Sequence, residues 1–209
     1  LSIVKDGSLV LDRSYGFGAS DPSGRLIETY SAGKTITATL IGAAVRQGLF
    51  SLDKPIVDYS TPRGAEWSNC KNGSISKLCR MMGVVNGSAC ADFFPNVTAR
   101  HLLSQSTGRG CFTPGTRFTY DSNDYIQHLS YLLDKTARDS PQNLSARDWA
   151  TKYFAAPLGL PNLYAYQDTD PSHEGDTPTI FGPHEQISAG GDQPLTCRDF
   201  ARVGQLIVN

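Results

Sequence analysis

The pattern of apolar and polar residues divides the chain into a strand-forming start and several helices. Residues 1–15 alternate around an Asp6-Gly7 dipeptide, which predicts a β-hairpin. After Lys34 the apolar residues continue almost all round a helix, which is too apolar for a helix on the surface. Gly48 stands where a left-handed C-cap is expected. We therefore predict a buried helix that begins near Ser31 and stops before Gly48.

Shorter apolar periods predict further helices. A short helix should begin at Ala99 and end by Gly108, and residues 114–120 form a turn that leads into an extended segment. Ser145 should cap a helix from residue 146 to about residue 154, and Thr196 should cap a last helix. A fourth helix should carry its apolar residues on one side: Tyr125, Ile126, Leu129, Leu132 and Leu133. The last helix should bury a stripe of Phe200, Val203, Leu206 and Ile207.

Composition excludes several classes of partner. The 209 residues are 39% apolar and 19% charged, as in a soluble globular protein with a sizeable core. The net charge of −1 gives no electrostatic reason to expect nucleic acid or an acidic membrane surface. No apolar run approaches the length that spans a bilayer. We therefore expect no nucleic-acid and no membrane partner.

Cysteines and glycosylation sequons gather in one segment. Residues 61–98 hold Cys70, Cys79 and Cys90, and Cys111 follows shortly afterwards. The Asn-x-Ser/Thr sequons begin at Asn72, Asn86, Asn96 and Asn143. This combination predicts a glycosylated loop with two disulfides in a secreted protein, with all three pairings of the four cysteines open. Zinc is the alternative, but no Cys-x-x-Cys pair is present. Cys197 is left over, either buried and free or paired with another chain.

Ser31 and Lys34 are the candidate catalytic pair. Residues three apart on a helix share a face, so the lysine amine can reach the serine hydroxyl, as a nucleophile and its base require. The same spacing recurs at Ser51 and Lys54, in a polar connector that runs into a proline. Strand, turn and buried helix surround Ser31. The alternative is that Ser31 caps the helix and Lys34 extends to solvent.

Several motifs in order resemble the serine β-lactamase-like hydrolases, whose relatives include class C β-lactamases, DD-peptidases, family VIII esterases and 6-aminohexanoate-dimer hydrolases. The resemblance is carried by residues 30–38, 99–108, 114–122, 157–160, 190–191 and 198–204. It runs almost from end to end of the chain. It implies that Ser31 is the acylated nucleophile, with no metal and no cofactor.

The resemblance also implies roles for other residues. Lys34 would accept the proton of Ser31, and Tyr120 would be the second base, from the family's Tyr-x-Asn or Tyr-x-Ser motif. Ser122 fills the third place of that motif and Asn123 follows one position later, so both are expected to bind substrate. Free tyrosine and lysine side chains have pKa values of about 10 and 10.4, so such a pair works near neutral pH only when charge or burial perturbs it.

The fold that the resemblance implies is α+β, with an antiparallel sheet flanked by helices and a mostly helical region facing it. Residues 1–50 would supply the first strands and the nucleophile helix, and residues 51–189 the mostly helical region with its loop at 61–98. Residues 190–209 would return to the sheet. The family's leading helix, closing strands and third motif are not among these residues, so we expect an incomplete β-lactamase-like domain. A second polypeptide should complete it, with Cys197 as a candidate link.

The function expected from the sequence is that of a secreted serine hydrolase, outside the cell or in the lumen of the secretory pathway. It would cleave an amide or ester in a small molecule or peptide through an acyl-enzyme. The sequons and cysteines indicate a eukaryotic secretory origin, where hydrolysis of an antibiotic has no evident use. The alternative is a catalytically inactive binding or structural protein on the same fold, or one subunit of a processed assembly.

Overall fold

The chain opens on a β-hairpin. The computed structural model describes residues 1–13, 26–59, 96–108, 112–120, 126, 128–161, 163, 187–191 and 193–208. Strands β1 (Ser2–Lys5) and β2 (Ser8–Asp12) pair antiparallel. Asp6 and Gly7 connect them with φ angles of 50° and 76°, and a two-residue hairpin turn favours such positive values at both positions. The predicted hairpin is confirmed.

The predicted buried helix is also confirmed. A short strand, β3 (Ile27–Glu28), leads into a 3₁₀ turn, η1 (Tyr30–Ala32), and then into α1 (Gly33–Arg46). Helix α1 therefore starts two residues after Ser31, which lies in the 3₁₀ turn. Gly48 takes the left-handed conformation expected after the helix, with a φ of 74°.

Short helices make up most of the remaining described structure. They are η2 (Ile56–Asp58), α4 (Ala99–Leu103), α5 (His128–Asp139), α6 (Ala146–Ala150), the π-helical turn η4 (Thr151–Ala155) and α7 (Cys197–Val208). Both predicted caps are present. The backbone N–H of Asp148 donates to Ser145 Oγ at 3.1 Å, and that of Asp199 donates to Thr196 Oγ1 at 3.0 Å.

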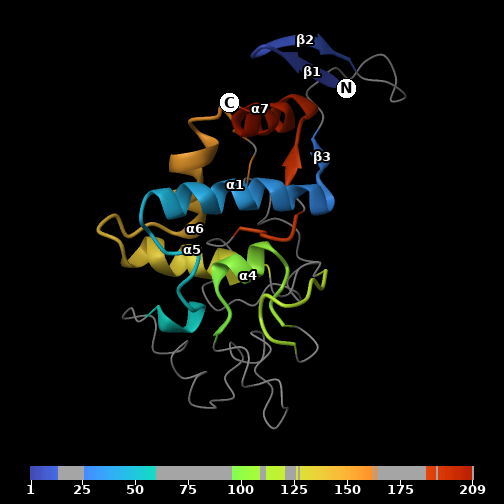
Figure 1. Ribbon diagram of the computed structural model, residues 1–209. Coiled ribbons are helices and arrows are strands. Elements are labelled where there is room, and N and C mark those ends of the chain that lie inside the picture. The colour runs from blue at the N-terminus through green and yellow to red at the C-terminus, as the bar shows by residue number, and fades with distance from the viewer. Residues whose placement is uncertain are drawn as a thin grey trace, which may run out of the picture.

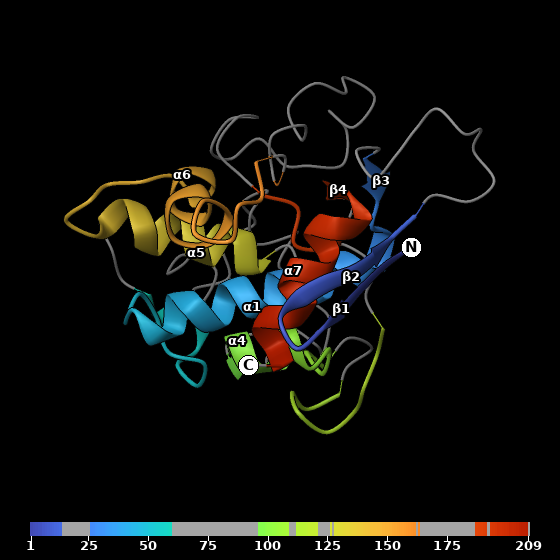
Figure 2. The same ribbon diagram turned by 90° about the horizontal axis from the view of Figure 1, so that it is seen from above.

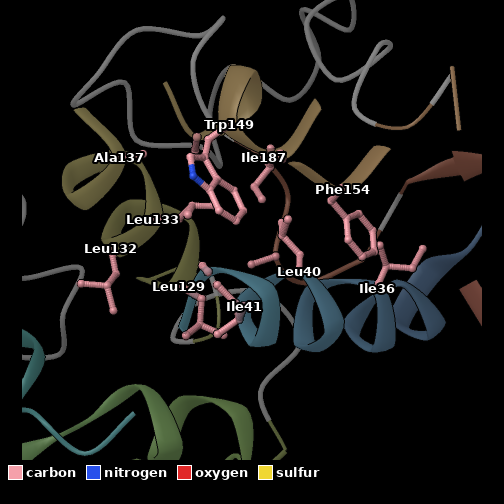
Figure 3. Packing of buried hydrophobic residues seen from close by; sticks show 14 of the residues in the cluster. Ile36, Leu40, Ile41, Leu129, Leu132, Leu133, Ala137, Trp149, Phe154 and Ile187 are labelled. Atoms are coloured by element: carbon pink, nitrogen blue, oxygen red, sulfur yellow. The ribbon is translucent and has the colours of Figure 1, made fainter. Parts of the chain in front are cut away.

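One hydrophobic core joins α1 to α5, α6 and η4. Its members on α1 are fully buried, and burying one leucine or isoleucine side chain stabilises the fold by about 1.5–3 kcal/mol. Figure 3 shows the side chains that meet in this core: Ile36, Leu40, Ile41, Leu129, Leu133, Trp149, Phe154 and Ile187. The core thus anchors the helix whose first turn follows Ser31.

Helix α5 is buried more completely than its sequence predicts. The apolar period indicated one buried side, but every residue from His128 to Ala137 is buried. Several of the polar residues among them form specific hydrogen bonds. Asp134, for example, accepts from the backbone N–H of Ala146 at 2.9 Å and from Arg138 Nε at 2.9 Å. Helix α5 is surrounded because α1, α4 and α6 all contact it.

The predicted buried stripe of α7 is wrong. Only Val203 of that stripe is buried, whereas Phe200, Leu206 and Ile207 are 37%, 44% and 56% exposed. Helix α7 contacts the short strands β1 and β4 (Pro194–Leu195), and these cover too little area to bury its whole apolar face. Figures 1 and 2 show the hairpin lying across α7, with α1 on the far side of that helix.

The architecture contains helices and small antiparallel sheets, as in an α+β fold. Instead of one sheet flanked by helices, the described residues form two separate two-stranded sheets, β1–β2 and β3–β4. The second sheet pairs Ile27 with Leu195 and Glu28 with Pro194, and its strands are too short for the sequence pattern to predict. None of the helices within the described ranges is long and apolar enough to cross a bilayer.

Candidate active site

The residue directly before Ser31 has a strained backbone conformation. Tyr30, directly before the serine, has a φ of 46°, which non-glycine residues adopt rarely and at a cost of about 1–3 kcal/mol. Gly191 packs against this turn so closely that a Cβ added to it would lie 2.0 Å from the Tyr30 carbonyl oxygen. Only glycine fits there. Such strain is common at functional sites.

The Ser31 hydroxyl receives two hydrogen bonds. Lys34 Nζ donates to Ser31 Oγ at 3.2 Å, and the Tyr120 hydroxyl donates to the same oxygen at 2.6 Å. Lys34 Nζ also lies 5.3 Å from the centroid of the Tyr120 ring. The structure therefore brings together the three residues that the sequence proposed as catalytic.

Ser31 is not the cap of α1. The residue at the N-cap is Ala32, with no side-chain cap hydrogen bond. The Lys34 side chain is half-buried and does not extend into solvent, because its amine also donates to the Gly190 carbonyl oxygen. The structure therefore does not have the alternative arrangement, in which Ser31 caps the helix and Lys34 extends to solvent.

Tyr120 reaches the site on a segment that is hydrogen-bonded to the residues directly after α4. The backbone N–H of Thr119 donates to the Gln105 carbonyl at 2.9 Å, and that of Gly115 donates to the Ser106 carbonyl at 2.8 Å. Gly115 has a φ of 87°, which suits glycine in the predicted turn. These bonds fix the segment on both sides of Phe118, so that Tyr120 points back to Ser31.

Residues 187–191 supply backbone acceptors to the start of α1. The carbonyl oxygens of Ala189 and Gly190 accept from Thr37 Oγ1, at 3.1 Å, and from Lys34 Nζ. Ser130 of α5 secures the start of this segment by accepting from the Ile187 N–H at 3.1 Å. The Gly190-Gly191 pair was noticed in the sequence as part of the resemblance, but its contact with Lys34 was not predicted, because a backbone carbonyl leaves no mark on residue type.

Ser51 and Lys54, one of the other Ser-x-x-Lys pairs in the chain, show how little the spacing alone determines. Ser51 Oγ accepts from the backbone N–H of Asp53 at 3.2 Å, and Lys54 Nζ lies over the Tyr59 ring, 4.5 Å from its centroid. At Ser31 the hydroxyl is exposed, with a half-buried amine on one side and a half-exposed phenol on the other. That arrangement allows a substrate carbonyl to approach a serine with two potential proton acceptors.

Several of the predicted substrate-binding, glycosylation and disulfide residues lie outside the described residues. They are Ser122, Asn123, Asn72, Asn86, Cys70, Cys79, Cys90 and Cys111. Asn96 and Asn143 are exposed, as an acceptor of a glycan would be. Cys197 is exposed rather than buried, and it has no disulfide partner within the described part of the chain. Among the same residues, no group of three or more histidine, cysteine or acidic side chains could hold a metal ion.

Comparison with protein families gives a match that covers most of the chain. A family model described as Beta-lactamase matches residues 1–178, a range that contains Ser31, Lys34 and Tyr120. A search of curated proteins found no match. Members of the matched family are generally serine hydrolases.

Proposed function

This chain belongs to the beta-lactamase family, and from that premise we propose that it is a serine hydrolase that cleaves an amide or an ester through an acyl-enzyme on Ser31. The observation that carries the proposal is the pair of hydrogen bonds to Ser31 Oγ, from Lys34 Nζ at 3.2 Å and from the Tyr120 hydroxyl at 2.6 Å. A serine hydroxyl is a weak nucleophile until an adjacent base takes its proton.

The reaction proceeds in two halves. Ser31 Oγ forms a bond to the substrate carbonyl carbon while its proton passes to Lys34 or Tyr120. The tetrahedral intermediate then collapses, the bond to the leaving alcohol or amine breaks, and the same pair returns the proton to that group. Water repeats the sequence on the Ser31 ester, releasing the acid and regenerating the hydroxyl. The backbone N–H of Ser31 is the proposed oxyanion donor supplied by this segment.

The positions of the two candidate bases suit them to different proton transfers. Lys34 is held by the Gly190 carbonyl as well as by Ser31, which keeps its amine at a fixed point beside the nucleophile. Tyr120 is 53% exposed and its hydroxyl also bonds to Ser31 Oγ, so its oxygen can reach a leaving group that departs toward solvent. We assign Lys34 to the first proton transfer and Tyr120 to protonation of the leaving group.

Hydrolysis of chromogenic esters and anilides tests the proposal. Ser31→Ala should lose activity by a factor of about 10⁴ or more, because the covalent route is gone. Ser51→Ala is the matched control: it makes the same substitution at the same Ser-x-x-Lys spacing, and it should keep parental rates. A Ser31→Ala variant that hydrolyses both substrates at the parental rate would overturn the proposal.

We propose further that the protein is secreted, glycosylated on its sequons and cross-linked through Cys70, Cys79, Cys90 and Cys111. The clustering of sequons and cysteines in residues 61–98 and shortly beyond supports this. Peptide mapping without reductant, before and after removal of glycans, should find two disulfides among these cysteines and glycans on exposed Asn96 and Asn143. Four free thiols and unmodified asparagines in material from a eukaryotic secretory pathway would contradict it.

A second proposal concerns the partner. Large apolar side chains are exposed on the hairpin and along α7: Leu1, Ile3, Leu9, Val10, Phe200, Leu206, Ile207 and Val208. Exposed apolar groups on neighbouring elements are typical of a surface that another polypeptide covers. We propose that a second polypeptide adds strands beside the hairpin and covers α7, with Cys197 as the link. Mass spectrometry of native material after removal of glycans should show a species heavier than 22.6 kDa without reductant and two polypeptides with it; a 22.6 kDa monomer at full activity would contradict this.

The alternative is that the chain is a catalytically inactive, secreted binding or structural protein. The exposed apolar surface on the hairpin and α7 is the observation that favours it. The ester assay described above distinguishes the two, since a silent site gives no difference between the parent and Ser31→Ala.

A further inference from the structure

Gln193 is a fully buried polar residue close to the nucleophile turn. Its side chain has no exposed surface. The side-chain Nε2 donates to the Ser188 carbonyl at 2.6 Å, and Oε1 accepts from Thr29 Oγ1 at 3.4 Å. Both ends of the carboxamide are thus used. A buried amide with partners at both ends fixes the position of the segments that it joins.

The bond from Nε2 closes a turn. Ser188 precedes the Gly190 carbonyl by two residues and Gln193 follows it by three, so the side-chain bond bridges the two ends of the segment that carries this carbonyl. The Gly190 oxygen is the acceptor for Lys34 Nζ. A change in the shape of this turn therefore moves the acceptor of the proposed base.

The bond to Oε1 joins the same turn to the nucleophile. Thr29 lies two residues before Ser31, and its backbone N–H also donates to the Gln193 carbonyl at 3.3 Å. Gly33 makes room for the amide, because a Cβ at that position would lie 1.9 Å from Gln193 Oε1. Gln193 therefore joins the residue two before Ser31 to the segment whose Gly190 carbonyl accepts from Lys34.

We propose that Gln193 is a positioning residue of the Ser31 site: its carboxamide binds the Ser188 carbonyl and thereby holds the Gly190 carbonyl against the Lys34 amine. The catalytic part of this inference rests on the proposed function. Its structural part, the restraint on the Lys34 amine, can be measured whether or not the protein is a hydrolase.

Gln193→Met tests the proposal, because methionine keeps the length of the side chain and removes both hydrogen bonds. Its kcat for the ester should fall about tenfold with KM within about twofold, since a small displacement of a catalytic group slows chemistry more than binding. Gln142→Met is the matched control. That glutamine is exposed, bonds to Tyr153 and Lys152, and should be replaceable without loss of rate.

A second readout does not depend on turnover. Competitive labelling with an amine-specific acylating reagent, quantified by peptide mass spectrometry, reports how freely the Lys34 amine reacts. In Gln193→Met the labelling of Lys34 should rise severalfold relative to Lys54, because the amine has lost an aligned acceptor. If the parent hydrolyses nothing but Lys34 labelling still rises, the proposed function fails and the restraint by Gln193 stands.

Thr29→Val provides a milder variant should Gln193→Met fold poorly. It removes only the hydroxyl that donates to Oε1, so its kcat should fall by less than that of Gln193→Met. The double variant should be no slower than Gln193→Met alone, because the shared bond is already lost. Parental kcat and parental Lys34 labelling in Gln193→Met would overturn the proposal. So would a loss of kcat matched by an equal rise in KM with Lys34 labelling unchanged, since that is the effect of a merely structural residue.

Discussion

Tyr120 touches Ser31 through a single atom. Its hydroxyl donates to Ser31 Oγ at 2.6 Å, while the rest of the side chain is half-exposed and contributes little to the core. Tyr120→Phe removes that oxygen and almost no packing. We expect kcat/KM for an amide substrate to fall by about 10²–10⁴-fold, the usual contribution of a general acid or base, with an unchanged melting temperature.

Esters provide the control for this variant. An alkoxide leaves more readily than an amine and needs less help from a proton donor, so Tyr120→Phe should slow ester cleavage less than amide cleavage. Parental rates on both substrates would remove Tyr120 from the proton transfers. Equal losses on both, together with a lower melting temperature, would show that its role is structural.

Residues of the site differed in how well the sequence predicted them. Ser31 and Lys34 are close in sequence and lie at the start of a strongly apolar helix, so local spacing was enough. Tyr120 lies 89 residues from Ser31 and was found only through the family resemblance. Gly190 and Gln193 act through a carbonyl and a buried amide, and neither belongs to a pattern of charge or periodicity.

Helix α4 begins with a capping box that depends on a neutral histidine. His101 Nδ1 accepts from the Thr98 N–H at 3.2 Å, while Thr98 Oγ1 accepts from the His101 N–H at 3.4 Å. Burial lowers the pKa of His101 below its usual 6.5, and the neighbouring Arg100 charge lowers it further. Protonation would remove the acceptor.

This capping box predicts a loss of stability in acid. Because the pKa of His101 is lower in the folded than in the unfolded state, its contribution is present above pH 6.5 and is lost as the pH falls through the folded value. The free energy of unfolding should therefore fall more between pH 7.5 and pH 5 for the parent than for His101→Gln, measured by urea denaturation. Equal losses in the two proteins would show that His101 does not control this dependence.

At the scale of elements, the predictions failed where burial depends on distant neighbours. The hairpin, α1 and the two side-chain caps follow from local residue types, and all are present. Helix α5 is buried on every side because three other helices contact it, and α7 keeps exposed apolar residues because its main contacts are with the short strands β1 and β4. Periodicity describes one face of a helix, but it does not indicate how many neighbours that helix will find.

At the scale of the whole molecule, a core of α1, α5 and α6 holds the Ser31 turn. The residues after α4 position Tyr120 beside it, and residues 187–191 bring the Gly190 carbonyl to it. The family match and the α+β architecture agree with this arrangement. The central claim is that Ser31 is a nucleophile.

The most direct test of that claim is covalent labelling with a fluorophosphonate probe, followed by intact-mass analysis and localisation of the adduct to a peptide. If Ser31 is the nucleophile, the probe should form one adduct per chain on Ser31. This adduct should be absent from Ser31→Ala, form much more slowly in Lys34→Ala and be unchanged in Ser51→Ala. Ser31→Ala should keep the parental melting temperature. An adduct of equal yield in Ser31→Ala, or no adduct in a parental protein that hydrolyses esters, would contradict the claim.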